Sequence, residues 1–185
     1  MRFLLIILFA IAPLRAGTIV GTVRAEGKPE VSEPGKGGKY DSRKFKFVER
    51  LDYQELQDFV VFIDQKPANA PAAPGKPLQV ITQRDAVFRP HVLPVVKGTT
   101  VEWPNKDEIF HNAFSMSEAK EFDLGLYRDP EVKQVTFDKA GRVDVFCSIH
   151  SQMSCVVLVL ENPWFASADP KTGRYRIENV PAGTY

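Results

Sequence analysis

Short runs of β-branched and other apolar residues, separated by turn-forming residues, recur through the second half of the chain. The runs lie at 79–82, 92–96, 99–103, 134–137, 142–146 and 155–160. Polar and glycine-containing segments, such as 97–98 and 139–141, separate several of them. Short strands punctuated in this way predict an all-β fold, a Greek-key β-sandwich.

The run at 155–160 differs from the others because it is apolar at every position. One face of a sandwich strand ordinarily meets water, so we expect a second layer over this strand. We expect the flanking segments 17–65 and 163–185 to supply that layer, with strands at 18–23 and 59–63. A Pro- and Ala-rich stretch at 67–77 predicts a stiff linker between the two parts.

The first residues have the composition of an export signal. Arg2 is followed by an apolar run at 3–14 and then by Arg15 and Ala16. This order predicts a secretory signal peptide at 1–16, cleaved after Ala16, although a buried first strand or helix is the alternative. No later apolar run is long enough to cross a bilayer. We therefore expect a periplasmic or secreted protein that does not span a membrane.

Composition excludes several classes of function. The 24 basic and 23 acidic residues nearly cancel, which argues against a protein that binds nucleic acid through its charge. Two cysteines cannot build a disulfide-rich scaffold, and three histidines are too few for a multi-metal oxidase. These counts leave room for one small site.

One stretch concentrates metal-binding side chains. Cys147, His150 and Met153 follow each other as C-x-x-H-x-x-M on a predicted turn between two strands. Three residues of chain reach at most about 10 Å, so these side chains can converge on one ion. Thiolate, imidazole and thioether form a soft donor set that suits copper better than zinc, calcium or magnesium. With His111 as a further ligand and Met153 as a weak axial one, this is the blue-copper arrangement.

Further motifs flank these residues. They are Phe88-Arg-Pro90, Val95-x-x-Gly98-Thr-Thr-Val101-x-Trp103-x-Asn105, His111-Asn112 and Phe137-x-x-x-Gly141. With them, residues 88–159 resemble the cupredoxins of the plastocyanin and amicyanin type. The resemblance implies one type 1 copper held by His111, Cys147, His150 and Met153. It also implies that Asn112 joins the two ligand-bearing loops through backbone hydrogen bonds.

Several residues near this stretch carry weaker expectations. Cys155 stands where the family usually has Gly, and we expect a buried inert thiol. A redox or metal role, or a disulfide with Cys147 under oxidising conditions, is the alternative. We expect His91 on the surface, and Met116 packed in the core or at its rim. Trp103 is expected in the core. A loop at 122–127 is expected near the site, either in a docking surface around His150 or beneath the ligand loops.

The flanking segments have a resemblance of their own. Residues 169–185 end in Val180-Pro-Ala-Gly-Thr-Tyr185, and Gly21-Thr-Val23 leads to a turn at Gly27-Lys28-Pro29. These features resemble the carboxypeptidase regulatory-like domain, a small transthyretin-like β-sandwich. The resemblance implies that 17–66 and 163–185 are two parts of one sandwich, with the cupredoxin at 78–162 inserted between them. The second part is expected to be truncated at Tyr185.

Three functions are consistent with these features. The first is an exported, monomeric type 1 copper protein that carries single electrons between redox protein partners and is not an enzyme. The second is a copper carrier or sensor that uses the same ligands. The third is a non-catalytic surface binding module in which the sandwiches themselves are the functional unit.

Overall fold

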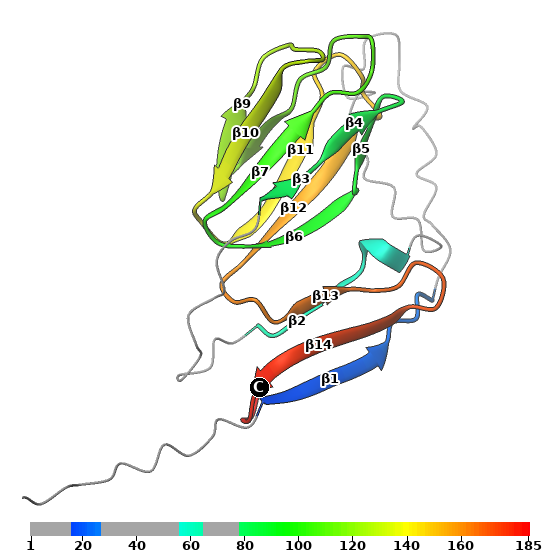
Figure 1. Ribbon diagram of the computed structural model, residues 1–185, viewed down its shortest axis with the longest axis vertical. Helices are drawn as coiled ribbons and strands as arrows, with labels where there is room; N and C mark the ends of the chain where they lie inside the picture. The colour runs from blue at the N-terminus through cyan, green and yellow to red at the C-terminus, as the bar shows by residue number, and fades with distance from the viewer. Residues whose placement is uncertain (1–15, 27–55, 65–77) are drawn as a thin grey trace, which may run out of the picture.

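The computed structural model describes residues 16–26, 56–64 and 78–185, and strands make up nearly all of the regular secondary structure in this part of the chain (Figure 1). One 3-10 turn, η2 (Leu56–Asp58), accompanies them. Among the described residues, no helix is long and apolar enough to cross a membrane. The predicted signal peptide lies, apart from Ala16, outside the described residues, as does the predicted linker at 67–77.

The larger unit is a sandwich of two sheets with an added hairpin. Its five-stranded sheet has the order β6 (Val92–Val96), β12 (Ser154–Leu160), β11 (Gly141–Phe146), β8 (Phe114–Ser117) and β9 (Lys120–Asp123). Its three-stranded sheet has the order β10 (Val132–Phe137), β7 (Thr99–Pro104) and β3 (Gln79–Val80). β4 (Thr82–Arg84) and β5 (Val87–Arg89) form the hairpin. The all-β prediction is confirmed.

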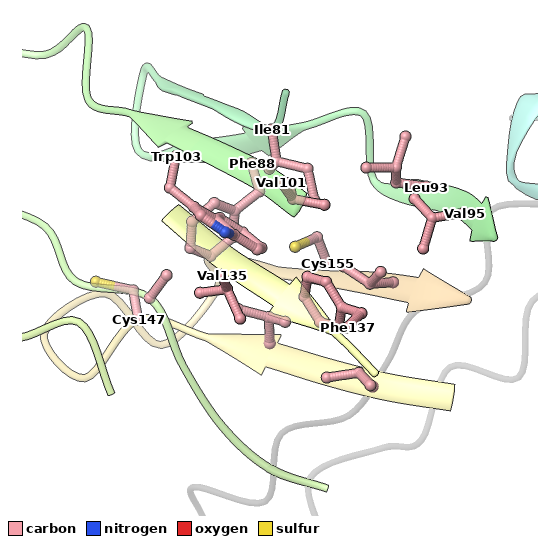
Figure 2. Close-up of a cluster of buried hydrophobic side chains, with 14 of the residues drawn as sticks. Ile81, Phe88, Leu93, Val95, Val101, Trp103, Val135, Phe137, Cys147 and Cys155 are labelled. Carbon is pink, nitrogen blue, oxygen red and sulfur yellow. The ribbon is translucent and has the colours of Figure 1, made fainter. Parts of the chain in front are cut away.

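Alternation along the strands builds the core. Val101 and Trp103 of β7 point inward, as do Val143 and Val145 of β11, and all four are fully buried. The Phe88 ring meets the Trp103 ring edge-on at 5.8 Å between centroids. Figure 2 shows the core side chains meeting between the strands, with Cys155 among them and Cys147 at one end of the cluster. The prediction that Trp103 lies in the core is confirmed.

Some strand predictions need correction. The predicted strand at 79–82 is divided into β3 and β4, because Ile81 lies between them and turns into the core. The hairpin of β8 and β9 was not predicted, because β8 turns Ser115 into the core and leaves Met116 75% exposed, and β9 has a single apolar residue, Phe122. The predicted loop at 122–127 consequently begins inside β9, and only its later residues are loop.

The flanking segments pair with each other, as the fold prediction requires. β1 (Ala16–Thr22) runs antiparallel to β14 (Arg174–Pro181), and β2 (Val60–Phe62) runs antiparallel to β13 (Phe165–Ser167). They share a small core of their own, formed by Trp164, Ile177 and Val180 with Ile19, Val61, Ile63, Ala166 and Tyr175 around it. The two ends of the described chain therefore form one second β unit below the larger sandwich (Figure 1).

A glycine is required where this second unit turns between β13 and β14. Gly173 has φ of +65°, and a Cβ there would lie 2.2 Å from the Val23 carbonyl oxygen. The turn is fixed by Asp169, whose Oδ1 accepts hydrogen bonds from the amides of Lys171 and Thr172 at 3.1 and 2.7 Å. These bonds, with one from the Thr172 hydroxyl, hold the pKa of Asp169 below its usual value.

Contacts join the second unit to the larger sandwich. The Asn162 amide donates to the Ile63 carbonyl at 2.7 Å, directly after β12 ends. His91 Nδ1 lies 2.7 Å from Asp58 Oδ2, which ties η2 to the start of β6. His91 is therefore a half-buried partner of Asp58, where the sequence had predicted a surface side chain. Val156 and Leu160, on the outer face of β12, are each 7% exposed, and Leu158 between them is half-buried, so this face is largely covered.

Trp164→Ala tests the core of the second unit. Trp164 is 3% exposed and its indole N–H donates to the Asn179 carbonyl at 2.9 Å. The substitution should lower the free energy of unfolding by about 3–5 kcal/mol, measured by urea denaturation followed by circular dichroism. Val20→Ala, at a site 63% exposed on β1, is the control and should cost less than about 1 kcal/mol. Equal losses for the two variants would contradict this assignment.

Candidate metal centre

Three metal-binding side chains meet at the end of the larger sandwich remote from the second unit. The ligand atoms of His111, Cys147 and His150 all lie within 4.8 Å of one another. His111 lies between β7 and β8, Cys147 follows β11, and His150 lies in the turn from β11 to β12. β11 enters this end of the sandwich and β12 leaves it toward β13 (Figure 1).

Cys147 continues the inward alternation of β11 and is 1% exposed. Its amide N–H donates to the Met153 carbonyl at 3.1 Å, and the Met153 N–H donates to the His150 carbonyl at 3.0 Å. These bonds close the turn that holds Cys147 and His150. Met153, the predicted axial ligand, has a fully buried side chain in the adjoining core. Its role as a ligand stays a prediction.

His111 is fully buried and is held at both its backbone and its ring. Its backbone exchanges two hydrogen bonds with Tyr127, of 3.1 and 2.9 Å. Its Nδ1 lies 3.0 Å from His150 Nδ1, and its Nε2 lies 2.7 Å from Asp107 Oδ2. An ionised carboxylate only accepts hydrogen bonds, so His111 Nε2 is the donor. In neutral His111 the Nδ1 atom then carries a lone pair, which accepts a hydrogen bond from His150 Nδ1.

Asp107 is a residue of the site that the sequence reading missed. Besides His111, its carboxylate accepts the amide N–H of Asp85 at 2.7 Å and that of Ala86 at 3.0 Å. Burial raises the pKa of Asp107, but the hydrogen bonds from Ala86, His111 and Asp85 outweigh burial and leave the pKa below its usual value. An Asp in a loop gives no periodic signal, so only the folded contact identifies it.

Asn112 joins the two ligand-bearing loops, as the family resemblance implied. Its Oδ1 accepts from the Ser148 amide at 2.7 Å and from the Ser148 hydroxyl at 3.0 Å. Its Nδ2 donates to Asp123 Oδ1 at 3.3 Å. Since Asn112 follows His111 and Ser148 follows Cys147, these bonds fix the separation of two candidate ligands. This prediction is confirmed.

A buried polar cluster lies behind the site. The Tyr127 hydroxyl donates to the Trp103 carbonyl at 2.7 Å, and the Gln83 amide donates to the same carbonyl at 3.2 Å and to the Tyr127 hydroxyl. Burial raises the pKa of Tyr127 and outweighs the hydrogen bond from Gln83, which lowers it; the nearby Glu131 and Cys147 raise the pKa further, so the phenol keeps its proton. The cluster anchors the strand segment that pairs with His111.

The remaining predicted residues can now be placed. Cys155 is a free thiol, 1% exposed in the core, and burial raises its pKa well above the ordinary value. That state matches the expected buried thiol, and Cys147 is likewise a free thiol in this structure. Met116 is 75% exposed on β8, so the expectation that it packs in the core or at its rim is wrong.

Exposed apolar side chains lie on the loops that carry the candidate ligands and Tyr127. Of the three clustered residues, His150 alone is only partly buried. The exposed neighbours are Ile109, Phe110, Leu126 and Ile149, each 46–56% exposed. Each lies within two residues of His111, of His150, or of Tyr127, which pairs with His111. We call these four side chains the apolar rim. The Arg128 guanidinium lies over the Phe110 ring, 5.0 Å from the ring centroid.

Two separations in this cluster fit a shared metal ion. Metal–nitrogen and metal–thiolate bonds of about 2.0 and 2.3 Å allow ligand atoms up to about 4.3 Å apart. The Nδ1 atoms of His111 and His150 are 3.0 Å apart, and Cys147 Sγ lies 3.7 Å from His150 Nδ1. Two imidazoles with one thiol, largely buried, form a donor set suited to copper. The residues present therefore fit the group that the sequence implies.

Comparison with known proteins adds similar structures. No protein-family model matches the sequence, and no curated protein matches it. A copper-containing nitrite reductase from Thermus scotoductus SA-01 is 27% identical with a TM-score of 0.44; the match covers 53% of this chain and 25% of that one. An amicyanin variant in its reduced Cu(I) form is 23% identical, TM-score 0.42, over 54% of this chain and 97% of that one.

A purple cupredoxin from Nitrosopumilus maritimus is 24% identical with a TM-score of 0.39, over 44% of this chain and 97% of that chain. The similarity thus involves about half of the present chain, and only a quarter of the nitrite reductase. The TM-scores of these three structures are all below 0.5.

Asn112→Ala tests the link between the ligand loops. Losing both hydrogen bonds to Ser148 should weaken Cu(I) binding about 10- to 100-fold, measured by competition with a chromophoric chelator. Ser148→Ala, the control, removes the hydroxyl bond and keeps the amide bond, and should have a smaller effect. Unchanged affinity in Asn112→Ala would mean that the loops hold their separation without this side chain.

Proposed function

We propose that the protein is a type 1 copper protein that carries single electrons. His111, Cys147 and His150 would bind the metal, with Met153 as a weak axial ligand. The observation that carries the proposal is a thiol and two imidazoles held within 4.8 Å at the end of a β-sandwich, with only His150 reaching the surface. Copper supplies one-electron redox chemistry when it is bound.

The chain's own contribution is a rigid set of ligands. His111 is fixed by Tyr127 and Asp107, and the Cys147 loop is fixed by Asn112. Metal binding at both Nδ1 atoms requires that the proton between them leave, and that the Cys147 thiol lose its own proton. Ligands that are held in place before binding keep their geometry in both oxidation states. Little reorganisation then opposes electron transfer.

A carrier, not an enzyme, is the role we infer. With Met153 as the fourth ligand, the centre would offer no open coordination position for a substrate. The apolar rim on the loops of the candidate ligands, together with the partly exposed His150, favours a redox protein partner that docks through apolar surface and exchanges electrons through this imidazole. We further propose that the protein is exported and monomeric, and that the second unit is a regulatory-like sandwich into which residues 78–162 are inserted.

The colour of the copper-loaded protein tests this function. The intact protein with Cu(II) should be intensely blue and show small copper hyperfine splitting in electron spin resonance. Cys147→Ser should abolish the colour, because the absorption comes from the thiolate bound to copper. Cys155→Ala should retain it, since Cys155 lies inside the core away from the ligand cluster.

Two outcomes would contradict the proposal. A colourless Cu(II) complex of the intact protein would exclude a type 1 centre, and so would an unchanged spectrum in Cys147→Ser. A blue centre that passes Cu(I) rapidly to a chelator and cannot be cycled by a redox partner would instead support copper carriage or sensing. Full binding of a surface partner by the His111→Ala, Cys147→Ser double variant would support the binding module.

Electron self-exchange tests the apolar rim as the place of electron transfer. Rapid exchange requires that two molecules bring their apolar rims together. Ile149→Lys places a positive charge on each rim, and the repulsion should slow self-exchange at least tenfold at low salt. A tenfold slowing corresponds to a rise of about 1.4 kcal/mol in the activation free energy. Nuclear magnetic resonance line broadening in mixtures of the two oxidation states measures the rate. Val20→Lys adds the same charge at an exposed site on β1 and should leave the rate nearly unchanged. Equal slowing by both variants would count against the rim.

A further inference from the structure

We propose that Asp107 is a positioning residue that selects the metal-binding tautomer of His111 and lowers the reduction potential of a copper bound there. The proposal rests on the copper function above, but its first step concerns the metal-free protein alone. Asp107 Oδ2 lies 2.7 Å from His111 Nε2, and its side chain is 14% exposed while that of His111 is fully buried. The contact is therefore a largely desolvated, charge-assisted hydrogen bond.

The carboxylate is held in place from a second direction. The turn between β4 and β5 consists of Asp85 and Ala86, which have positive φ of 57° and 53°. Neither is glycine, so this left-handed turn needs support from its surroundings. Both of its amide N–H groups donate to Asp107, at 2.7 and 3.0 Å. The hairpin turn and the His111 ring are thus joined through one carboxylate.

A ring of hydrogen bonds completes the arrangement. The Asp107 amide donates to Asn105 Oδ1 at 2.9 Å, and Asn105 Nδ2 donates to the Tyr127 carbonyl at 3.0 Å. Tyr127 exchanges backbone hydrogen bonds with His111, whose ring returns to Asp107. Each member is bonded to the next, so the His111 imidazole is fixed in both orientation and protonation.

Two consequences follow for the centre. With the proton on Nε2, the His111 Nδ1 lone pair faces His150 and Cys147, where a metal would bind. The negative charge behind the ring makes the imidazole a stronger donor. A stronger donor and a nearby negative charge both favour Cu(II) over Cu(I), so Asp107 lowers the reduction potential.

Two variants of Asp107 separate geometry from charge. Asp107→Asn keeps an acceptor oxygen and removes the charge, so the spectrum should stay blue while the reduction potential rises. Asp107→Ala removes both, and Cu(I) affinity should fall about 10- to 100-fold. Glu108→Gln removes a carboxylate from an exposed position of the same loop and is the matched control for charge; its potential should stay near that of the unaltered protein.

The metal-free protein gives an independent readout. Nitrogen-15 chemical shifts of His111 should report the Nε2–H tautomer in the unaltered protein and a mixture of tautomers in Asp107→Ala. Glycine adopts the left-handed conformation without strain, so Ala86→Gly should stabilise the turn between β4 and β5. The double variant Asp107→Ala, Ala86→Gly should therefore be more stable to unfolding than Asp107→Ala, but should regain neither the Cu(I) affinity nor the single tautomer. That result separates positioning from a merely structural role.

The proposal is overturned if the His111 tautomer in Asp107→Ala equals that of the unaltered protein. It is also overturned if Asp107→Asn and Glu108→Gln have the same potential. The two proposals can also give different results. If the unaltered protein shows a single Nε2–H tautomer that Asp107→Ala loses, but forms no blue copper complex, the positioning role is supported and the type 1 function is rejected. The failures of the two proposals can therefore be told apart.

Discussion

The pairing of β11 with β12 is the constraint on which the rest of the structure depends. Its antiparallel register places Val143, Val145 and Cys147 on the inner face, so the thiol reaches the end of the core as the strand ends. The same pairing forces a turn between Cys147 and Met153, and His150 lies within that turn. A slip of one residue would send Cys147 to the outer face and remove the site.

The site divides into a part built by strands and a part tied by side chains. Strand pairing places Cys147 and His150, whereas His111 comes from a loop that strands alone do not fix. Two side chains supply the missing constraints: Asn112 joins the two ligand-bearing loops, and Asp107 orients the His111 imidazole through a hydrogen bond. The second unit lies at the opposite end, where Asn162 and the His91–Asp58 contact join it to the sandwich. In the proposed function, electrons therefore enter and leave away from the second unit.

Much of this arrangement could be predicted from local sequence, and the remainder required the fold. Alternation over 99–103 and 142–146 predicted two core strands, and C-x-x-H-x-x-M spacing predicted that Cys147 and His150 share a turn. Asp107 could not be predicted, because its contacts with Asp85 and Ala86 bridge segments about twenty residues apart. The β8–β9 hairpin and the place of Met116 could not be predicted, because β8 turns the polar Ser115 inward and the apolar Met116 outward.

The proposed centre consists of one copper bound by Cys147 and two histidines at the end of the sandwich. X-ray absorption at the copper edge, recorded on the intact protein in both oxidation states, can detect these bonds. We expect one short copper–sulfur bond and two copper–nitrogen bonds that change little between the oxidised and reduced forms. A spectrum without the short sulfur bond, or with a different coordination number in the two states, would contradict this proposal.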